Sequence, residues 1–202
     1  MGPSSKQPGA VKRTSGTLGL GLLILAAAYY AWSSSIADGS RLRGKGVEIR
    51  SSSGNVKVVG TQEQDVRVTI EHAGDHAAKT ARIRIDRSRN PILIEIDDIP
   101  QRAIALVEVP HGVSLAVSMS AGELQISNID GDKRCLLRSG EMVIDVGDPA
   151  GYKSVRGFVF AGDVDARAFH AEKGGLWRMM TWSGPGVAVI DAHVSTGKLE
   201  MR

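Results

Sequence analysis

The sequence predicts an all-β domain, built as a right-handed β-solenoid or β-helix-like stack of short strands, behind one N-terminal transmembrane helix. Three observations lead to this prediction. Apolar and polar residues alternate from Val47 onward, a pattern typical of strands. A small residue followed by glycine recurs in front of several of these strands. Residues 18–32 form one continuous apolar run. An antiparallel β-sandwich is the alternative arrangement of the same strands.

Length and composition fit one folded domain with a tail. The 202 residues are 42% apolar and 23% charged, which is typical of a folded chain. The formal net charge is +3, but residues 1–45 alone carry +5, and residues 46–202 hold 19 basic and 21 acidic side chains. We therefore expect no nucleic-acid partner. Cys135 is the single cysteine, which excludes an intramolecular disulfide and disfavours a thiolate metal cluster.

The N-terminal part of the chain indicates a membrane address. We divide the chain into a basic polar tail, a transmembrane helix or signal anchor, a linker and a β domain, at residues 1–15, 16–36, 37–46 and 47–202. No charged residue lies between Arg13 and Asp38, and the 21 residues from Gly16 to Ile36 are enough to cross a bilayer. Three aromatic residues would lie in the interfacial belt, namely Tyr29, Tyr30 and Trp32.

A cleaved signal peptide is the alternative reading of this segment. Lys12 and Arg13 would form its positive region, and Ser35-Ile36-Ala37 is a small-x-small cleavage pattern. Basic residues flank the apolar run on both sides, so their count hardly decides the orientation. We expect a single-pass protein of the cell membrane with its C-terminal domain outside the cytoplasm, or an exported domain after cleavage, because β bodies of this kind are common on cell envelopes.

Apolar residues two positions apart mark the expected strands. They are Val47/Ile49, Val56/Val58, Val66/Val68/Ile70, Ile83/Ile85, Ile92/Ile94/Ile96, Val107/Val109 and Val113/Leu115/Val117. Segments rich in glycine, proline, aspartate and asparagine separate later strands, at residues 128–132, 147–151 and 171–175. No helical period follows residue 46, although residues 75–81 could form a short helical turn.

A recurring unit joins these strands into a larger pattern. A small residue precedes Gly54, Gly122, Gly140, Gly162, Gly197 and, in a copy displaced by an inserted Pro185-Gly186, Gly184. Apolar residues follow two and four positions later, as Val56/Val58, Leu124/Ile126, Met142/Ile144, Val164/Ala166 and Leu199/Met201, and as Val187/Val189 in the displaced copy. Glycine allows a tight turn or a positive φ angle, and the strand that follows points alternate side chains inward. We expect these corners to stack and so build one shared core.

Four segments carry a family resemblance, at residues 51–60, 136–146, 160–169 and 194–202. They resemble the Ser-Gly-Asp/Asn-Val repeats of the bacterial putative adhesin domain family, whose function is unknown. Residues 104–131 are similar to that family's strand ending in Val-Pro, glycine turn and first Ser-Gly unit. The likeness spans residues 47–202 and departs from the family pattern at Pro185-Gly186 and in residues 61–101. It implies a β-solenoid-like domain that is exported or attached to a membrane anchor.

Polar clusters in the sequence have simpler explanations than catalysis. Glu71, His72, Asp75 and His76 could ligate a metal, but they straddle a strand end where polar residues collect. Asp130 and Asp132 fit a turn and lack the remaining ligands of a calcium loop, and Asp97 and Asp98 face opposite sides of a strand. No nucleophile elbow, phosphate-binding loop or dinucleotide fingerprint is present. We expect no catalytic residue, no metal and no cofactor.

Two pairs of residues are candidates for surface binding. Arg82 and Arg84 share one strand face and could bind anionic polysaccharide or lipid headgroups, although charge on an exposed strand also blocks edge pairing. Trp177 and Trp182 could stack on sugars, and their alternative role is in the core or at its cap.

These observations favour a non-enzymatic, membrane-anchored envelope protein that displays its β-solenoid surface for adhesion, scaffolding or protein contact. Its expected partners are the membrane, through residues 16–36, and a protein or polysaccharide ligand. One alternative is an envelope-stress or regulatory partner protein. Another is a carbohydrate-active β-helix enzyme, which would need carboxylates or basic groups converging in a groove.

Overall fold

The computed structural model describes residues 45–71 and 81–202. The expected tail, membrane span and most of the linker lie outside the described residues, as do His72, Asp75, His76 and most of the expected helical turn at 75–81. Among the described residues, no helix has the length and apolar character needed to cross a membrane.

The described part of the chain is all β, which confirms that prediction. Its strands are β1 (Gly46–Thr61), β2 (Arg67–Glu71), β3 (Arg82–Asp86), β4 (Ile92–Asp97), β5 (Ile104–Pro110), β6 (Ser114–Ser127), β7 (Lys133–Ile144), β8 (Tyr152–Ala166), β9 (Ala171–Ser183) and β10 (Ala188–Met201). Two single-turn 3₁₀ helices, η2 (Pro149–Gly151) and η3 (Arg167–Phe169), flank β8, and the described residues form no α-helix.

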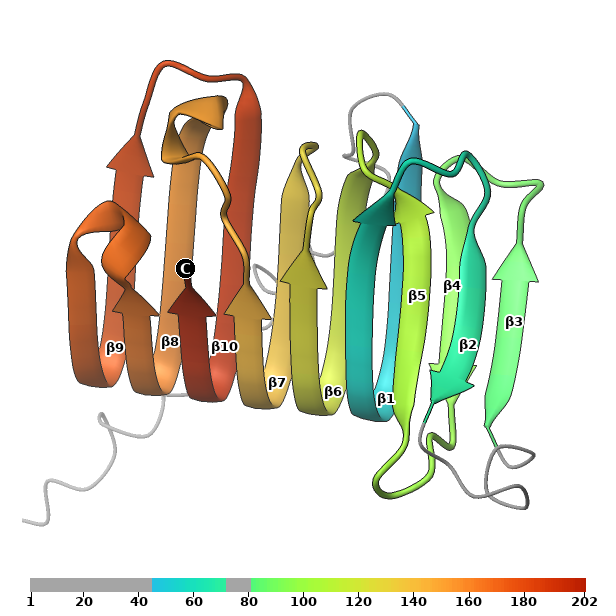
Figure 1. The fold of residues 1–202 in the computed structure, drawn as a ribbon. Helices are drawn as coiled ribbons and strands as arrows, with labels where there is room; N and C mark the ends of the chain where they lie inside the picture. Colours follow the sequence, from blue (N-terminus) through green and yellow to red (C-terminus); the bar gives the residue numbers. More distant parts are fainter. Residues whose placement is uncertain (1–44, 72–80) are drawn as a thin grey trace, which may run out of the picture. The chain divides into compact units, whose positions relative to one another are not determined.

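The strands form one mixed, mainly parallel sheet (Figure 1). Its central strands are all parallel to their neighbours, in the order β1, β6, β7, β10 and β8. Antiparallel pairing occurs only toward the ends, where β9 pairs with β8, β2 with β5 and β3 with β4. The alternative of an antiparallel sandwich is therefore wrong. The order also departs from the chain order, because the C-terminal strand β10 lies between β7 and β8.

Each central strand bends sharply at a glycine, and these glycines lie side by side. Gly54 pairs with Gly122, Gly122 with Gly140, Gly140 with Gly197, and Gly197 with Gly162. We call these five residues the glycine row. All five have φ angles between 118° and 134°, a region that side chains with a Cβ rarely adopt. A Cβ on any of the last four would also collide with the carbonyl oxygen of its neighbour in the row. Figure 1 shows the bends aligned along one side of the sheet.

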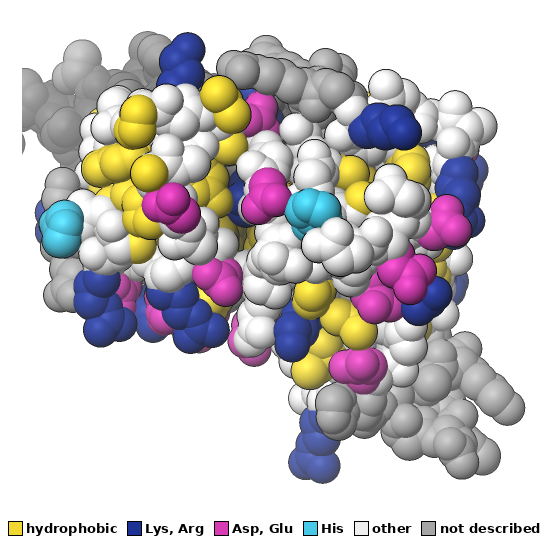
Figure 2. All heavy atoms as spheres, turned by 45° about the horizontal axis from the view of Figure 1, so that its top comes forward, with side chains coloured by type: hydrophobic (Ala, Val, Ile, Leu, Met, Phe, Trp, Pro, Cys, Tyr) yellow, Lys and Arg dark blue, Asp and Glu magenta, His cyan; other side chains and the backbone are white. Residues whose placement is uncertain are grey.

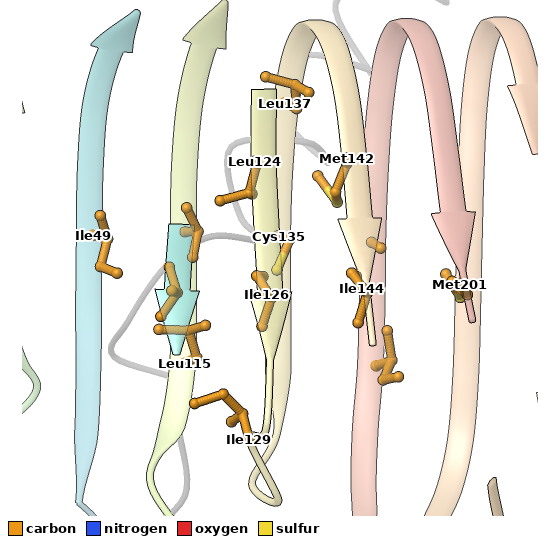
Figure 3. Close-up of a cluster of buried hydrophobic side chains, with 14 of the residues drawn as sticks. Ile49, Leu115, Leu124, Ile126, Ile129, Cys135, Leu137, Met142, Ile144 and Met201 are labelled. Atoms are coloured by element: carbon orange, nitrogen blue, oxygen red, sulfur yellow. The ribbon is translucent and has the colours of Figure 1, made fainter. Parts of the chain in front are cut away.

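The bends place the two halves of each strand in facing layers, with the core between them. The apolar residues at two and four positions after the glycine row are all buried, namely Val56/Val58, Leu124/Ile126, Met142/Ile144, Val164/Ala166 and Leu199/Met201. They pack against residues of the first halves, such as Ile49, Leu115 and Leu137. Figure 3 shows part of this core between the two layers, including Leu124, Ile126 and Met142.

Gly184 does not belong to the glycine row, which corrects the expectation from the sequence. It lies in the connection from β9 to β10, where its N–H donates to the carbonyl of Lys153. The inserted Pro185-Gly186 extends this connection, so Val187 is 78% exposed rather than buried. The glycine that pairs with Gly162 on its other side is Gly175, with a φ angle of 112°.

The described residues between β1 and β6 continue the stack without a glycine corner. β4 pairs with the first half of β1 and β5 with the second half, so two separate strands take the place of one bent strand. Ile99, in the connection between them, lies directly against Gly54. Short outer strands then complete the sheet on this side, with β3 antiparallel to β4 and β2 antiparallel to β5.

We predict that Gly140→Ala destabilises the domain by about 3–5 kcal/mol, because it combines an unfavourable positive φ angle with a backbone collision in the middle of the row. Denaturant unfolding followed by tryptophan fluorescence measures the loss. Gly112→Ala is the matched control, since a Cβ there has open space and an ordinary φ angle. Equal stability of the two variants would contradict the role of the row.

Candidate functional site

The two arginines singled out in the sequence, Arg82 and Arg84, lie on β3, close to acidic side chains. Arg82 and Arg84 are exposed, as expected. The Arg82 side chain forms an ion pair of 2.7 Å with Asp98, and Arg84 forms one of 3.6 Å with Glu95 on the neighbouring strand β4. Exposed pairs of this kind contribute little to stability. They place a carboxylate beside each of the two arginines, so this surface is not purely basic.

The two tryptophans lie in different environments. Trp182 packs against the core, with its ring centroid 5.1 Å from that of Phe169. Trp177 is 52% exposed and has a φ angle of 55°. The structure therefore does not bring the two rings together as one sugar-stacking platform.

Trp177 instead belongs to a cluster on the outer side of β8 and β9. Its ring meets Phe158 and Phe160 edge to face, at centroid distances of 6.0 and 5.0 Å. Met179 pairs with Phe158 across the two strands and is 53% exposed. We call Phe158, Phe160, Trp177 and Met179 the aromatic patch. Edge-to-face contacts fix the orientation of the rings, so the patch offers a preformed apolar surface.

His193 on β10 adjoins the aromatic patch. Its register partner on β8 is Phe158, and the two rings meet edge to face with their centroids 4.7 Å apart. Burial lowers the pKa of His193 to about 4, because the protonated ring would lose its hydration. The imidazole is therefore neutral at physiological pH, and it extends the apolar character of this side of β8.

A second candidate is an acidic pocket of about 430 Å³ at the start of β8. Its lining includes three carboxylates and a phenol, from Asp130, Asp145, Asp148 and Tyr152. The Tyr152 hydroxyl donates to the carbonyl of Val146, at 2.9 Å. Asp148 caps η2 by accepting from the N–H of Ala150. In the described part of the chain, no three histidine, cysteine, aspartate or glutamate side chains are placed to hold a metal ion.

Behind Tyr152 lies a fully buried lysine. Lys133 begins β7 between Leu115 and Ile190 of the neighbouring strands, at a core position. Its Nζ donates to the Tyr152 hydroxyl oxygen at 2.8 Å and to the Gly131 carbonyl at 3.4 Å, and it lies 4.8 Å from the centre of the Tyr152 ring. Burial lowers the pKa of Lys133 to about 8, against the attraction of nearby acidic groups.

Other polar residues singled out in the sequence have structural roles. Asp132 accepts from the N–H of Val189 at 2.9 Å and so ties the start of β7 to β10. The Asp130 Oδ2 atom lies 3.7 Å from the His111 Nε2 atom. Cys135 is buried, and burial raises its pKa to about 12, so the thiol stays protonated and is a poor nucleophile.

The sequence pattern did not indicate several of these residues as members of a site. Lys133 precedes Cys135 and Leu137 at the same spacing of two, so the alternation placed it on the core face although its charge argued against burial. Phe158, Phe160 and Met179 alternate on the opposite phase from the core residues of β8 and β9, which is the signal of an apolar outer face. No sequence signal shows that β8 and β9 bring these residues together.

Comparisons with known proteins give a likeness of fold. No protein family model matches the chain, and no curated protein matches it. The chain is similar to a crystal structure described as a putative cell adhesion protein from Clostridium sporogenes ATCC 15579, with a TM-score of 0.50 and 10% sequence identity. The match covers 81% of this chain and 94% of that one. At this identity the likeness concerns the fold alone.

Lys133 gives a prediction on the pH dependence of stability. Its pKa is lower in the folded chain, at about 8, than the ordinary value of 10.5, so between these values the unfolded chain binds more protons. The folded state therefore gains stability as the pH rises through this window, by up to about 3 kcal/mol. We expect the unfolding free energy of the natural chain, relative to that of Lys133→Met, to rise from pH 7.5 to pH 10.5.

The comparison with Lys133→Met is needed because Cys135 and Tyr152 titrate in the same range and act in the opposite direction. Burial raises the pKa of each to about 12, so their contributions fall as the pH rises. Lys153→Met, at an exposed neighbouring lysine, is the matched control for the removal of an amine. A flat difference between the natural chain and Lys133→Met would show that the buried amine does not titrate in this window.

Proposed function

We propose that this chain is a non-enzymatic envelope protein that presents a β-solenoid surface for adhesion and protein contact. Residues 16–36 hold it in the cell membrane, and the domain that begins near residue 47 lies outside the cytoplasm. The expected anchor rests on the uninterrupted apolar run and its aromatic flank.

The glycine row supports the solenoid part of this proposal. Five bent strands stack with their corners and both halves in register, so each unit buries its apolar residues only against its neighbours. This is the physical arrangement of repeat proteins, in which stacking builds the core. The insertion of β10 between β7 and β8 makes the stack non-sequential; the register of β10 with β8 shifts at Ala188/Val189 and is regular around the glycine row.

The aromatic patch is the observation that carries the proposed role in protein contact. Exposed aromatic and methionine side chains are enriched at the centres of protein interfaces, where they exclude water over a large area. Figure 2 shows apolar side chains gathered toward the β8–β10 end of the domain, with charged side chains beside them and over the rest of the view. The fold likeness to a protein described as a cell adhesion protein agrees with this role.

The titratable groups support a non-catalytic reading. The one amine with a strongly lowered pKa among the described lysines, Lys133, is fully buried and already bonded to Tyr152 and Gly131. The cysteine thiol is buried and protonated. Both groups therefore fit a structural role in the core better than contact with a substrate.

We predict that the full chain with a C-terminal tag sediments with membranes and that protease added to intact spheroplasts removes the tag. Deletion of residues 1–36 should leave the tagged domain in the soluble fraction of the cytoplasm. Recovery of the full chain in the soluble cytoplasmic fraction, or a tag protected from protease, would contradict the proposed location.

The contact role has its own test in cells that produce the full chain. We expect such cells to aggregate in suspension, and we expect Trp177→Ala to reduce the aggregated fraction several-fold because it removes the most exposed ring of the patch. Val187→Ala is the matched control, since Val187 is exposed in the β9–β10 connection and lies outside the patch. Equal aggregation by both variants would exclude the patch as the contact surface.

A further inference from the structure

β9 ends the sheet and offers a long backbone edge. Among the described residues, it pairs along one side with β8 and has no strand on its other side. At 13 residues, it is more than twice as long as β2 or β3, the five-residue strands at the opposite end. An unpaired edge presents a row of backbone N–H and C=O groups that can pair with another strand.

The outer strands at the two ends of the sheet differ in their charge and in their exposed apolar side chains. β2 and β3 carry charges at alternate or terminal positions, which discourages pairing with a further strand. β9 has a single charged residue, Arg178, between Gly174 and Ser183. It also exposes large apolar side chains, with Leu176 64% exposed, Trp177 52% and Met179 53%. The start of β9 carries two charged residues, Glu172 and Lys173, but the segment from Leu176 to Ser183 has less of this protection than β2 and β3.

We propose that β9 pairs along this edge with β9 of a second copy of the chain. Two identical strands related by a two-fold axis perpendicular to the sheet run antiparallel, as β9 already does with β8. Such a contact is self-complementary and closes after two copies, so it leaves neither β9 edge open. The proposal deepens the contact role by naming a partner, but it rests on the described strands and not on the membrane location.

The faces of β9 restrict the register of this pair. The segment from Leu176 to Ser183 follows the bend at Gly175, and residues directly opposite each other in an antiparallel pair must share a face. One residue must therefore lie opposite its own copy, with the two-fold axis between them. Centring the pair on this segment makes that residue Met179 or Met180.

The surroundings of Arg178 favour the axis at Met180. Arg178 is the one charged residue of this segment, and its pairing with the core residue Val159 places it on the inner face, where Trp182, which pairs with Val155, also lies. With the axis at Met180, Arg178 of one copy lies opposite Trp182 of the other on the inner face, where a guanidinium can stack on an indole ring. On the outer face, Met179 of one copy lies opposite Thr181 of the other.

Cysteine pairing in the full chain tests this register. Two differently tagged copies, one carrying Met179→Cys and the other Thr181→Cys, are produced together and oxidised with copper phenanthroline in detergent. Opposite residues of paired strands come close enough for a disulfide, whereas diagonal neighbours are farther apart. We expect several-fold more disulfide-linked dimer carrying both tags from this mixture than same-variant dimer from either variant alone. The natural Cys135 is buried and should contribute no background.

The control mixture combines Met179→Cys with Val187→Cys, which lies beyond the end of β9. Equal cross-linking in the control mixture, or no cross-linking in either mixture, would overturn the proposal. A monomeric full chain in sedimentation velocity would also overturn it, and would show that something other than a second copy covers the edge.

A lysine variant gives a second, independent measurement. Met179→Lys introduces a charge on the exposed face of β9 and should halve the sedimenting mass of the full chain, while the matched variant Val187→Lys keeps the dimer. An unchanged mass for Met179→Lys would count against pairing along β9. These measurements use the detergent-solubilised chain, so dimers from a chain found in the cytoplasm would refute the proposed location and leave the β9 pairing intact.

Discussion

The contact on which the structure depends is the close stacking of backbone at the glycine row. Four of these glycines leave room for the carbonyl oxygen of a neighbour in the row, Gly54 leaves room for Ile99, and all five take a φ angle that a side chain would make costly. The backbone can therefore turn at the same level in five successive strands. Because the turns are level, the two halves of every strand stay in register with their neighbours. The aliphatic residues on both sides of the turn then meet as continuous rows in the core.

Burial at the interior of this stack dominates the chemistry of its ionisable groups. Lys133, Cys135 and Tyr152 all have shifted pKa values whose main cause is the loss of hydration. Lys133 is retained at a core position because its amine has two oxygen partners and the face of an aromatic ring. A buried charge without such partners would be much more costly. The polar groups near the start of β7 therefore close one end of the core, as Asp132 also does through its bond to β10.

The outer strands at the two ends of this sheet differ in length and charge. Toward β2 and β3 the strands become short, antiparallel and charged, which removes the template for further pairing. Toward β9 the last strand is long, weakly charged and flanked by the aromatic patch. The two ends of the sheet therefore differ in the length and charge of their outer strands.

The sequence by itself determined the strand content, the five glycine corners and the inward phase of the residues after them. These features depend on local properties, namely the freedom of glycine and the two-residue period of a strand. Only the tertiary structure decided that β10 lies between β7 and β8, that Gly175 rather than Gly184 extends the row of corners, and that Trp177 and Trp182 are separated. Strand order and strand direction depend on which backbone edges meet, and residues far apart in the chain provide those edges. A pattern of neighbouring residues therefore predicts which way a side chain points, but not which strand lies beside it.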